Sequence, residues 1–527
     1  MAFTMKTHLA EGPRQLPVPD IGESPVLFAD HLGAWYAEQI DAAHRKVHGH
    51  YLTPPLIADF MGGLCIGEPC RTIRLLDPAA GTGTLAAAAC MALARSESPP
   101  SHIELVAYEI DPGLLPVLEA CFDYLSGWLK ARDIGLSVRL EHGDFVLINA
   151  GALEGGLFPF ENRFDAVICN PPYFKLPKSD PRAQACMSVV HGQPNVYGLF
   201  MAIGAALLRE GGRFVYITPR SFASGPYFQR FRQWFFERVR PTELHVFESR
   251  SEAFDEVLQE TVITAGARAT AWRTDQNTMA RISTSSGASD IGARQSRELP
   301  IAEVLRGDCA HQLLYLPASE EHDRVRDLVG GWKGSLHAYG WEVSTGPVVA
   351  FRAKAWLRHE TGEDHTPLLW LRHVRPMSVE WPLGMRKAQY IDDVQATSHL
   401  LVPNRNYVLL RRFSAKEEKR RLTAAPYLAR RFGTHARIGL ENHLNYIHRP
   451  GGGQLSEIEA HGLAALLNSH LMDTWFRIGS GNTQVSATEL RAMPLPPLDV
   501  IRRIGKRVML TSERVDAIVQ SELGPVG

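Results

Sequence analysis

Short runs of consecutive apolar residues, separated by longer segments with helical spacing, dominate the first half of the chain. Six such runs occupy residues 73–77, 103–111, 137–145, 164–170, 212–218 and 260–269. Strands that alternate with helices in this way are typical of a parallel sheet with helices on both faces. The uninterrupted apolar stretch at 166–169 is what a strand buried on both faces requires. The pattern therefore predicts an α/β fold.

Apolar residues with helical spacing predict the helices between these strands at 86–95, 114–132 and 197–209. Before the first strand, the same spacing predicts a helix over 28–46. Thr53-Pro54-Pro55 then offers an N-cap and a first-turn proline for a helix over 54–64. Residues 1–25 contain several prolines and glycines without periodicity, which predicts a flexible N-terminus.

The pattern changes after residue 270. Residues 271–300 are polar and poor in apolar side chains, so we expect a linker there. Residues 331–450 carry 19 Lys and Arg against 10 Asp and Glu, although the whole chain has a net charge of −1. The same segment holds five of the ten tryptophans. Such partitioned charge indicates a local nucleic-acid surface and excludes a uniformly basic protein.

The densest basic run lies between residues 411 and 431. A solvated helix face is the usual explanation of such a run, but the partitioned charge favours contact with phosphates. The residues predicted to bind DNA are Arg411, Arg412, Lys419, Arg420 and Arg421. Candidates for reading bases are Asn404, Arg405 and Asn406, for which an Asn-rich turn is an equally good explanation.

Length and composition set the remaining limits. A chain of 527 residues that is 45% hydrophobic is expected to form two or three domains. Seven scattered cysteines without a CxxC pair fit a reducing, cytoplasmic location. No signal peptide and no apolar stretch of membrane-spanning length is apparent, so no membrane is expected. His44, His48 and His50 lack companion ligands, and we predict no metal site.

Polar residues follow the first three predicted strands. Gly81 and Gly83 permit a tight turn after Asp77, which serves either a bare strand-to-helix connection or the close approach of a ligand. Glu109, at the end of the second strand, is placed where an acid can bind ribose hydroxyls. Asp144 can accept from an adenine amino group, or it can simply cap a turn. The absence of a third glycine disfavours a nicotinamide dinucleotide.

The fourth strand ends in Asn170-Pro171-Pro172-Tyr173, the most specific signal in the chain. Two prolines directly after a buried strand forfeit two backbone donors and stiffen the backbone, which a mere surface turn rarely needs. The asparagine oxygen and the first proline carbonyl can both accept from an amino group, while the tyrosine offers a flat stacking surface. A planar amino substrate is therefore indicated, and no catalytic cysteine is needed because Cys169 belongs to the apolar strand.

These motifs together resemble a known family. TPPLIADFM (53–61), DPAAGTG (77–83), EID (109–111), GDF (143–145) and NPPY (170–173) occur in the order found in the gamma arrangement of S-adenosylmethionine-dependent N6-adenine DNA methyltransferases. The segment GNTQVSATELRAMPLP (481–496) is similar to the C-terminal part of BsuBI/PstI-type modification methylases. The resemblance covers residues 30–265 strongly and 460–497 moderately.

The resemblance implies roles for individual residues. Residues that would hold S-adenosyl-L-methionine are Thr53, Asp77, Ala79, Gly81, Gly83, Glu109, Ile110, Asp144 and Phe145. Residues implied in catalysis are Asn170, Pro171, Pro172 and Tyr173. Of these, Asn170 and Pro171 would accept hydrogen bonds from the target amino group. Tyr173 and Phe254 would stack on that base after it has been flipped out of the duplex.

The resemblance also implies an overall organisation. We predict a doubly wound, mostly parallel, seven-stranded, Rossmann-like methyltransferase sheet in residues 26–270 and the linker 271–300. A mixed α/β target-recognition domain over 301–460 and a C-terminal helical segment over 461–527 follow. The expected activity is N6 methylation of adenine in a specific double-stranded DNA sequence, either beside a separately encoded restriction endonuclease or as an orphan methylase.

The sequence leaves several alternatives open. NPPY-type sites serve any planar amino or amide nitrogen, so RNA adenine and protein glutamine are rival substrates. A non-catalytic DNA-binding protein that retains the fold is another. The long basic second region favours duplex DNA, because reading several base pairs in a groove needs such a surface.

Overall fold

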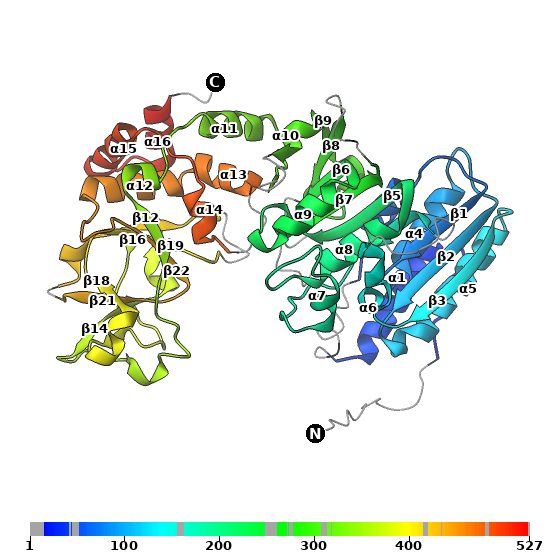
Figure 1. Ribbon diagram of the computed structural model, residues 1–527, viewed down its shortest axis with the longest axis horizontal. Coiled ribbons are helices and arrows are strands. Elements are labelled where there is room, and N and C mark those ends of the chain that lie inside the picture. Colours follow the sequence, from blue (N-terminus) through cyan, green and yellow to red (C-terminus); the bar gives the residue numbers. More distant parts are fainter. Residues whose placement is uncertain are drawn as a thin grey trace. The chain divides into compact units, whose positions relative to one another are not determined.

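The computed structural model describes residues 15–524, except 42–43, 45–51, 155–162, 248–260, 271, 273–277, 307–312, 318, 415–419, 434 and 480–483. The chain divides into two units, Met1–Ala318 and Ser319–Gly527 (Figure 1). In the described part, no helix is both long and apolar enough to cross a membrane.

A nine-stranded sheet forms the frame of the N-terminal unit, in the order β3-β2-β1-β4-β5-β7-β6-β8-β9. Its strands are β1 (Thr72–Asp77), β2 (His102–Glu109), β3 (Gly135–His142), β4 (Phe164–Cys169), β5 (Leu208–Pro219), β6 (Val239–Phe247), β7 (Thr261–Arg268), β8 (Met279–Ser285) and β9 (Gln295–Pro300). β7 pairs antiparallel with β5 and β6, and β9 pairs antiparallel with β8, whereas the other pairings are parallel. The predicted class, an α/β fold with a mostly parallel sheet, is confirmed.

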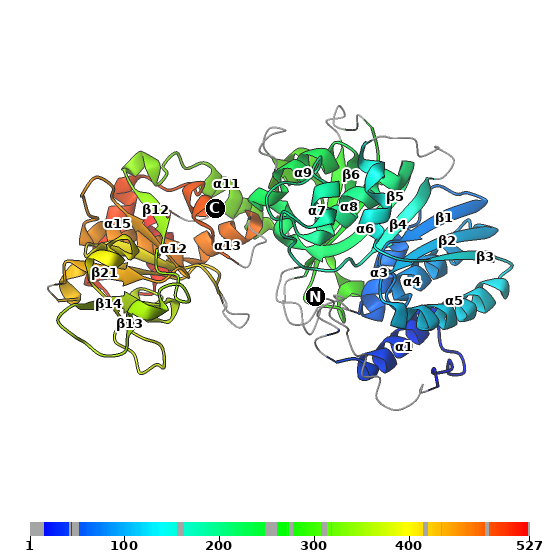
Figure 2. The ribbon, with the colours of Figure 1, turned by 60° about the horizontal axis from the view of Figure 1, so that its bottom comes forward.

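Helices cover both faces of this sheet, as Figure 2 shows. One apolar core holds α1 (Pro25–Gln39), α3 (Pro55–Leu64), α4 (Thr84–Ala94) and α5 (Leu115–Lys130). The opposite core holds α6 (Phe145–Asn149), α7 (Pro181–Ala185), α8 (Val196–Leu207), α9 (Gln229–Phe236) and α10 (Ile301–Val304). α1 ends earlier than the sequence predicted because Ile40 adopts an extended backbone.

The number of strands and the linker require correction. The sheet has nine strands and not seven, because β8 and β9 lie in the segment 271–300 that was predicted as a linker. β9 forms the edge of the sheet, and four of its six residues are at least partly exposed polar side chains. An edge strand needs little apolar surface, so its composition resembles that of a loop. A short pair, β10 (Leu305–Arg306) and β11 (Leu313–Leu314), follows in the same unit.

The C-terminal unit is built on two small sheets. Its four-stranded sheet has the order β12-β22-β19-β20, and its five-stranded sheet has the order β13-β17-β14-β21-β18. The strands are β12 (Glu342–Thr345), β13 (Leu357–Arg358), β14 (His365–Leu369), β17 (Tyr390–Asp392), β18 (Leu401–Pro403), β19 (Tyr407–Arg411), β20 (Ala424–Tyr427), β21 (Arg437–Leu440) and β22 (Leu444–His448), with a separate pair β15 (Val374–Arg375) and β16 (Ser378–Val379).

Helices complete this unit. They are α11 (Glu320–Gly330), α12 (Glu457–Asn468), α13 (His470–Gly479), α14 (Ala487–Arg491), α15 (Leu498–Leu510) and α16 (Val515–Leu523). The predicted C-terminal helical segment belongs to the same unit as the two sheets, and the boundary between the units lies after residue 318. Residues 301–318, which were predicted in the recognition domain, belong to the N-terminal unit.

Two glycines allow α12 and α15 to cross in close contact. A Cβ atom built on Gly462 would lie 2.0 Å from the carbonyl oxygen of Ile501, and one built on Gly505 would lie 2.0 Å from the carbonyl oxygen of Ile458. Backbone atoms cannot give way as a flexible side chain can, so the crossing depends on the absence of side chains at both positions.

We predict that Gly505→Ala lowers the free energy of unfolding by about 1–3 kcal/mol, because the added methyl group separates the two helices. Gly330→Ala is the matched control in α11, where a Cβ would meet no atom within 4 Å. That variant should lose no stability and gain at most about 1 kcal/mol. Chemical denaturation measures both, and an unaffected Gly505→Ala variant would contradict the close crossing of α12 and α15.

Candidate active site

The polar residues predicted from the sequence meet at one edge of the large sheet. β3, β2, β1 and β4 are neighbours that run parallel, so their carboxyl ends lie side by side. Asp77 and Glu109 are the last residues of β1 and β2, and Asn170 follows β4 directly. In open α/β sheets this edge is where ligands bind.

The loop after β1 depends on two glycines with positive φ, +57° at Gly81 and +89° at Gly83. A Cβ on Gly83 would lie 2.9 Å from the Sγ of Cys121, so this glycine permits close packing against α5. A Cβ on Gly81 would meet nothing within 4 Å. Gly83 thus secures the loop, while Gly81 leaves room beside the backbone.

Glu109 ties this loop to the end of β2. Its Oε2 accepts from the backbone N of Gly81 at 3.0 Å, and its Oε1 accepts from the backbone N of Ile110 at 2.9 Å and of Asp111 at 2.8 Å. The side chain is buried, and this burial raises the pKa of Glu109 to about 7. Ile110, next to it, leaves 47% of its surface exposed, which is an apolar face at the mouth of the site.

Asp77 lies beneath the loop and is fully buried. Its Oδ1 accepts from the backbone N of Ala79 at 3.3 Å, whereas its Oδ2 has no hydrogen-bond partner among the described residues. Burial raises the pKa of Asp77 to about 7. A buried oxygen without a partner costs free energy, so a donor from a ligand is the natural complement.

Asp111 is held by two residues from the N-terminal segment. The Tyr36 hydroxyl donates to its Oδ2 at 2.8 Å, and the Nε2 of His44 lies 2.7 Å from the same oxygen. Its Oδ1 accepts from the backbone N of Gly113 at 3.0 Å. Because the backbone N of Asp111 donates to Glu109, this network braces the end of β2. Neither Tyr36 nor His44 belongs to a recognisable motif, so this network could not be predicted from the sequence.

The Asn170-Pro171-Pro172-Tyr173 turn forms a connected group with Thr53. The Nδ2 of Asn170 donates to the Oγ1 of Thr53 at 3.0 Å, across 117 residues of chain. The Tyr173 hydroxyl donates to the Oδ1 of Asn170 at 2.6 Å and also contacts the carbonyl oxygen of Ile217 at 3.1 Å. These contacts fix the orientation of the Asn170 amide. The structure therefore brings together Thr53 and the NPPY turn, two segments that the resemblance assigned to the cofactor and to the target adenine.

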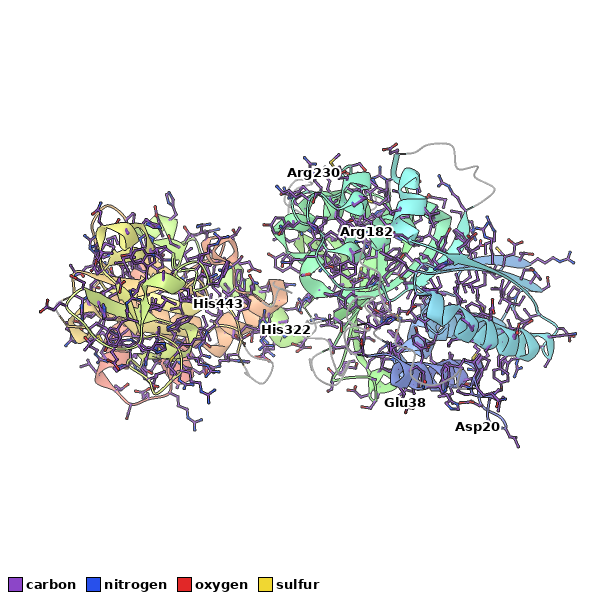
Figure 3. The ribbon with its side chains drawn as sticks, turned by 90° about the horizontal axis from the view of Figure 1, so that it is seen from below. Asp20, Glu38, Arg182, Arg230, His322 and His443 are labelled. Carbon is purple, nitrogen blue, oxygen red and sulfur yellow. The ribbon has the colours of Figure 1, made fainter. Side chains whose placement is uncertain are left out.

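Asp144 and Phe145 occupy different surroundings. The Oδ1 of Asp144 caps α6 by accepting from the backbone N of Leu147 at 3.1 Å, and its Oδ2 lies 3.6 Å from the Nη1 of Arg182. The ring of Phe145 is 2% exposed and packs against Tyr108 and Phe200. This ring is therefore a core side chain, and its contact with the cofactor stays a prediction. Arg182, labelled in Figure 3, is a partner that sequence reasoning missed.

Four residues singled out in the sequence lie outside the described part of the chain. Phe254, His48, His50 and Lys419 are not described.

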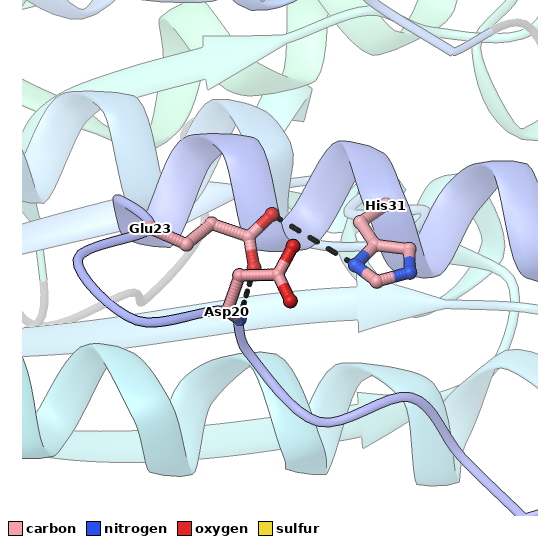
Figure 4. Close-up of side chains that lie close together, drawn as sticks. All are labelled: Asp20, Glu23 and His31. Carbon is pink, nitrogen blue, oxygen red and sulfur yellow. Dashed lines mark hydrogen bonds and ion pairs between the residues drawn. The ribbon is translucent and has the colours of Figure 1, made fainter.

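In the described part of the chain, one group of potential metal ligands is close enough to share an ion: Asp20, Glu23 and His31 (Figure 4). Glu23 already accepts from the backbone N of Asp20 at 2.9 Å and lies 3.8 Å from His31, so an ion pair and a turn account for this group.

Two of the predicted DNA-binding arginines are buried, and the two others that the structure describes, Arg412 and Arg420, are partly exposed. Arg411 and Arg421 are 7% and 2% exposed, and the Nε of Arg411 donates to the carbonyl oxygen of Val374 at 2.6 Å. Phosphate contact is therefore wrong for these two, because a buried guanidinium cannot reach DNA. Arg412 donates to the carbonyl oxygen of Asn442 at 2.7 Å, and Arg420 pairs with Asp516.

The three base-reading candidates form a turn. The Oδ1 of Asn404 accepts from the Tyr427 hydroxyl at 2.7 Å, and the Oδ1 of Asn406 accepts from the backbone N of Ala429 at 3.1 Å. Arg405 donates to the carbonyl oxygen of Gly453 at 3.3 Å. These contacts fit the turn that the sequence left open as the alternative.

Comparison with known proteins agrees with the geometry at the sheet edge. Residues 141–254 match the Eco57I restriction-modification methylase family. The chain is 33% identical to the type II methyltransferase M.BsuBI of Bacillus subtilis over 473 residues, which cover 89% of this chain and 92% of that protein. It is 30% identical to M.PstI of Providencia stuartii over 527 residues, covering 98% and 99% of the two proteins.

A weaker match is to a tRNA1(Val) (adenine(37)-N6)-methyltransferase of Vibrio vulnificus. It is 27% identical over 148 residues, covering 28% of this chain and 51% of that protein. The two type II enzymes, in contrast, extend over both units of the chain. By this identity and coverage, the chain belongs to the type II methyltransferases of restriction-modification systems, together with M.BsuBI and M.PstI.

Proposed function

We propose that this protein transfers the methyl group of S-adenosylmethionine to the N6 amino group of an adenine flipped out of a specific double-stranded DNA sequence. The observation that carries the proposal is the joining of Asn170, Thr53 and Tyr173 beside the glycine loop, in a chain of the type II family. We further propose that a separately encoded restriction endonuclease acts on the same sequence.

The residues at the ends of β1 and β2 fit the cofactor. Glu109 offers a buried carboxylate for ribose hydroxyls, and Ile110 offers an exposed apolar face for a flat ring. The partnerless Oδ2 of Asp77 suits the ammonium group of the methionine moiety, and Gly81 leaves room for it. When bound there, the cofactor supplies an electrophilic methyl group.

The NPPY turn supplies what the amino group needs. An adenine amino nitrogen is a poor nucleophile because its lone pair is delocalised into the ring. Acceptors at Asn170 Oδ1 and the Pro171 carbonyl draw on its two hydrogens, which localises the lone pair and orients it toward the methyl donor. Tyr173 and Thr53 hold the Asn170 amide in place, so the acceptor is positioned before the substrate arrives.

Phosphate contacts in the C-terminal unit are better assigned to exposed cations. Those in its described part include Arg352, Lys354, Arg372, Arg375, Arg386 and Lys387. All lie in the basic segment 331–450, but outside the run 411–431. An exposed cation can release counterions from DNA, whereas a buried one cannot.

RNA adenine is the second candidate, favoured by the match to the tRNA methyltransferase. That match covers 28% of the chain, whereas the matches to the two type II enzymes cover 89% and 98% of it. One assay separates the candidates: incubate the protein with radiolabelled cofactor and either mixed-sequence duplex DNA or total RNA, and then map the modified adenines. N6-methyladenine at one recurring duplex sequence is expected, and faster transfer to RNA would overturn the proposal.

Asn170→Ala should reduce methyl transfer to duplex DNA by at least about a hundredfold, because the acceptor for the amino group is lost. The dissociation constant of the cofactor should stay nearly unchanged, since Glu109 and the glycine loop remain. Calorimetry and a methylation assay measure the two quantities. If cofactor binding were lost as well, the assignment of Asn170 to the target amino group would be wrong.

Cofactor affinity should fall as the pH drops below about 7, where the Glu109 carboxylate gains a proton and stops accepting from hydroxyl groups. Binding at pH 8, 7 and 6 tests this directly. Glu109→Gln should bind more weakly at pH 8 and show a smaller dependence on pH, with any remainder assigned to Asp77. A wild-type cofactor affinity that stays constant from pH 8 to pH 6 would contradict this role of Glu109.

Tyr36→Phe should weaken cofactor binding by roughly twofold to tenfold, the equivalent of one lost hydrogen bond, because Asp111 and the end of β2 lose a brace. Tyr124→Phe is the matched control: its hydroxyl donates to the carbonyl oxygen of Glu23 and not to Asp111. Equal effects of the two variants would show that the Tyr36 hydroxyl acts through general stability alone.

A further inference from the structure

A cavity of about 280 Å³ opens in the C-terminal unit, within the basic segment 331–450. Its lining combines two aromatic side chains, two exposed cations and a paired acid and histidine: Trp370, Phe413, Arg372, Lys387, Glu441 and His443. Glu441 is the only acid among the lining residues. The charge at this surface thus complements a polyanion.

The acid and the histidine lie on the tight turn between β21 and β22, and Figure 3 labels His443. The backbone N of Leu444 donates to the carbonyl oxygen of Glu441 at 2.9 Å, which closes the turn. The backbone N of Glu441 donates to Leu369 of the five-stranded sheet, and the backbone N of Arg412 donates to His443 from the end of the four-stranded sheet. Both sheets therefore hold the turn rigidly.

Glu441 and His443 differ sharply in exposure. The side chain of Glu441 is 2% exposed, and that of His443 is 47% exposed. The Oε1 of Glu441 lies 2.6 Å from the Nδ1 of His443, and its Oε2 accepts from the backbone N of His443 at 3.1 Å. The ring of Phe413 packs edge-on against the imidazole at 5.0 Å. The buried carboxylate therefore fixes an exposed ring.

This arrangement determines what the ring can recognise. An imidazole that donates from Nδ1 to a carboxylate presents Nε2 as an acceptor in its neutral form. In DNA, the amino groups N4 of cytosine and N6 of adenine are the major-groove donors that such an acceptor can read. The exposed Arg372 and Lys387 are suited to the phosphates that flank the base.

We propose that His443, held by Glu441, reads the exocyclic amino group of one base in the recognition sequence. This inference rests on the proposed function, because it assigns part of the specificity of that reaction. His443 contacts the base edge, and Glu441 is a positioning residue that keeps the ring oriented. Reading by a side chain on a rigid turn gives the base contact a fixed geometry.

The test uses the full-length protein. The recognition sequence is first mapped with the wild type on a mixed-sequence duplex library, and kcat/KM is then measured on that sequence and on each single base-pair variant of it. His443→Ala should lose roughly tenfold to a hundredfold of the discrimination at one base pair and keep it elsewhere. His359→Ala, at an exposed histidine of the same unit outside the cavity, should keep the whole profile.

Base analogues identify the group that is read. Duplexes in which 2-pyrimidinone replaces cytosine, or purine replaces adenine, lack the amino group at a chosen position. The wild type should lose activity on one of these two duplexes, whereas the activity of His443→Ala should not change on it. The duplex that is affected shows whether the base that is read is cytosine or adenine. A third duplex carries 7-deazaguanine in place of guanine at the base pair where His443→Ala loses discrimination. If wild-type activity depended on this replacement, the proposal would be overturned, because an acceptor on the base would be read and not an amino group.

Glu441 variants separate positioning from general stability. Glu441→Ala should relax discrimination at the same base pair, and Glu441→Gln, which can still accept from the imidazole, should restore most of it. A change in melting temperature with an unaltered specificity profile would make Glu441 merely structural and overturn its role. If the variants fold and His443→Ala has the wild-type profile, the inference fails alone; if the wild type methylates no duplex DNA, the proposed function fails with it.

Discussion

The carboxylate of Glu109 is the contact on which the candidate active site depends. It accepts three backbone N–H groups, one from the glycine loop after β1 and two from the end of β2. Neither segment has regular secondary structure there, so without the carboxylate their donors would need water or another acceptor. Burial opposes the ionised form of Glu109, and the three donors favour it. The loop geometry and the charge of the site are thus coupled.

A second group of contacts, on the other side of β1, also joins segments that are far apart in the sequence. Thr53 comes from the start of α3 and Asn170 from the end of β4, yet one hydrogen bond joins them. Tyr173 then links Asn170 to the carbonyl oxygen of Ile217 in β5. Because three separate elements hold one amide, the site is organised by the sheet and not by the flexible turn alone. The residues that we propose to act on the adenine are those that the fold already constrains.

Much of the large sheet and of the candidate active site could be predicted from the sequence, because strands buried on both faces appear as runs of consecutive apolar residues. All six apolar runs proved to be strands, and the motifs at their ends meet at one sheet edge. The elements that escaped notice have weaker signals for physical reasons. β6 contains Pro241 at an irregularity in its pairing with β7, and β9 is a polar edge strand. Tyr36 and His44 act through Asp111 over long sequence distances, which no local pattern reports.

Charge was the least reliable guide, and the C-terminal unit shows why. The run 411–431 is dense in arginine, yet Arg411 and Arg421 are interior side chains. The guanidinium of Arg411 donates to the main chain of β15, and the backbone N of Arg421 donates to Asp473 of α13. The long stem of arginine packs well, and its fork of donors can satisfy carbonyl oxygens that small irregular sheets leave unpaired.

A unit built from short strands and turns has many such oxygens, so part of its arginine content is needed for folding and says nothing about a partner. What distinguishes a recognising group is exposure combined with a fixed orientation. His443 has both, because Glu441 is buried behind it and the two sheets hold the turn that carries them. Composition can locate a basic unit, whereas only burial and geometry can separate the side chains that build it from those that face outward.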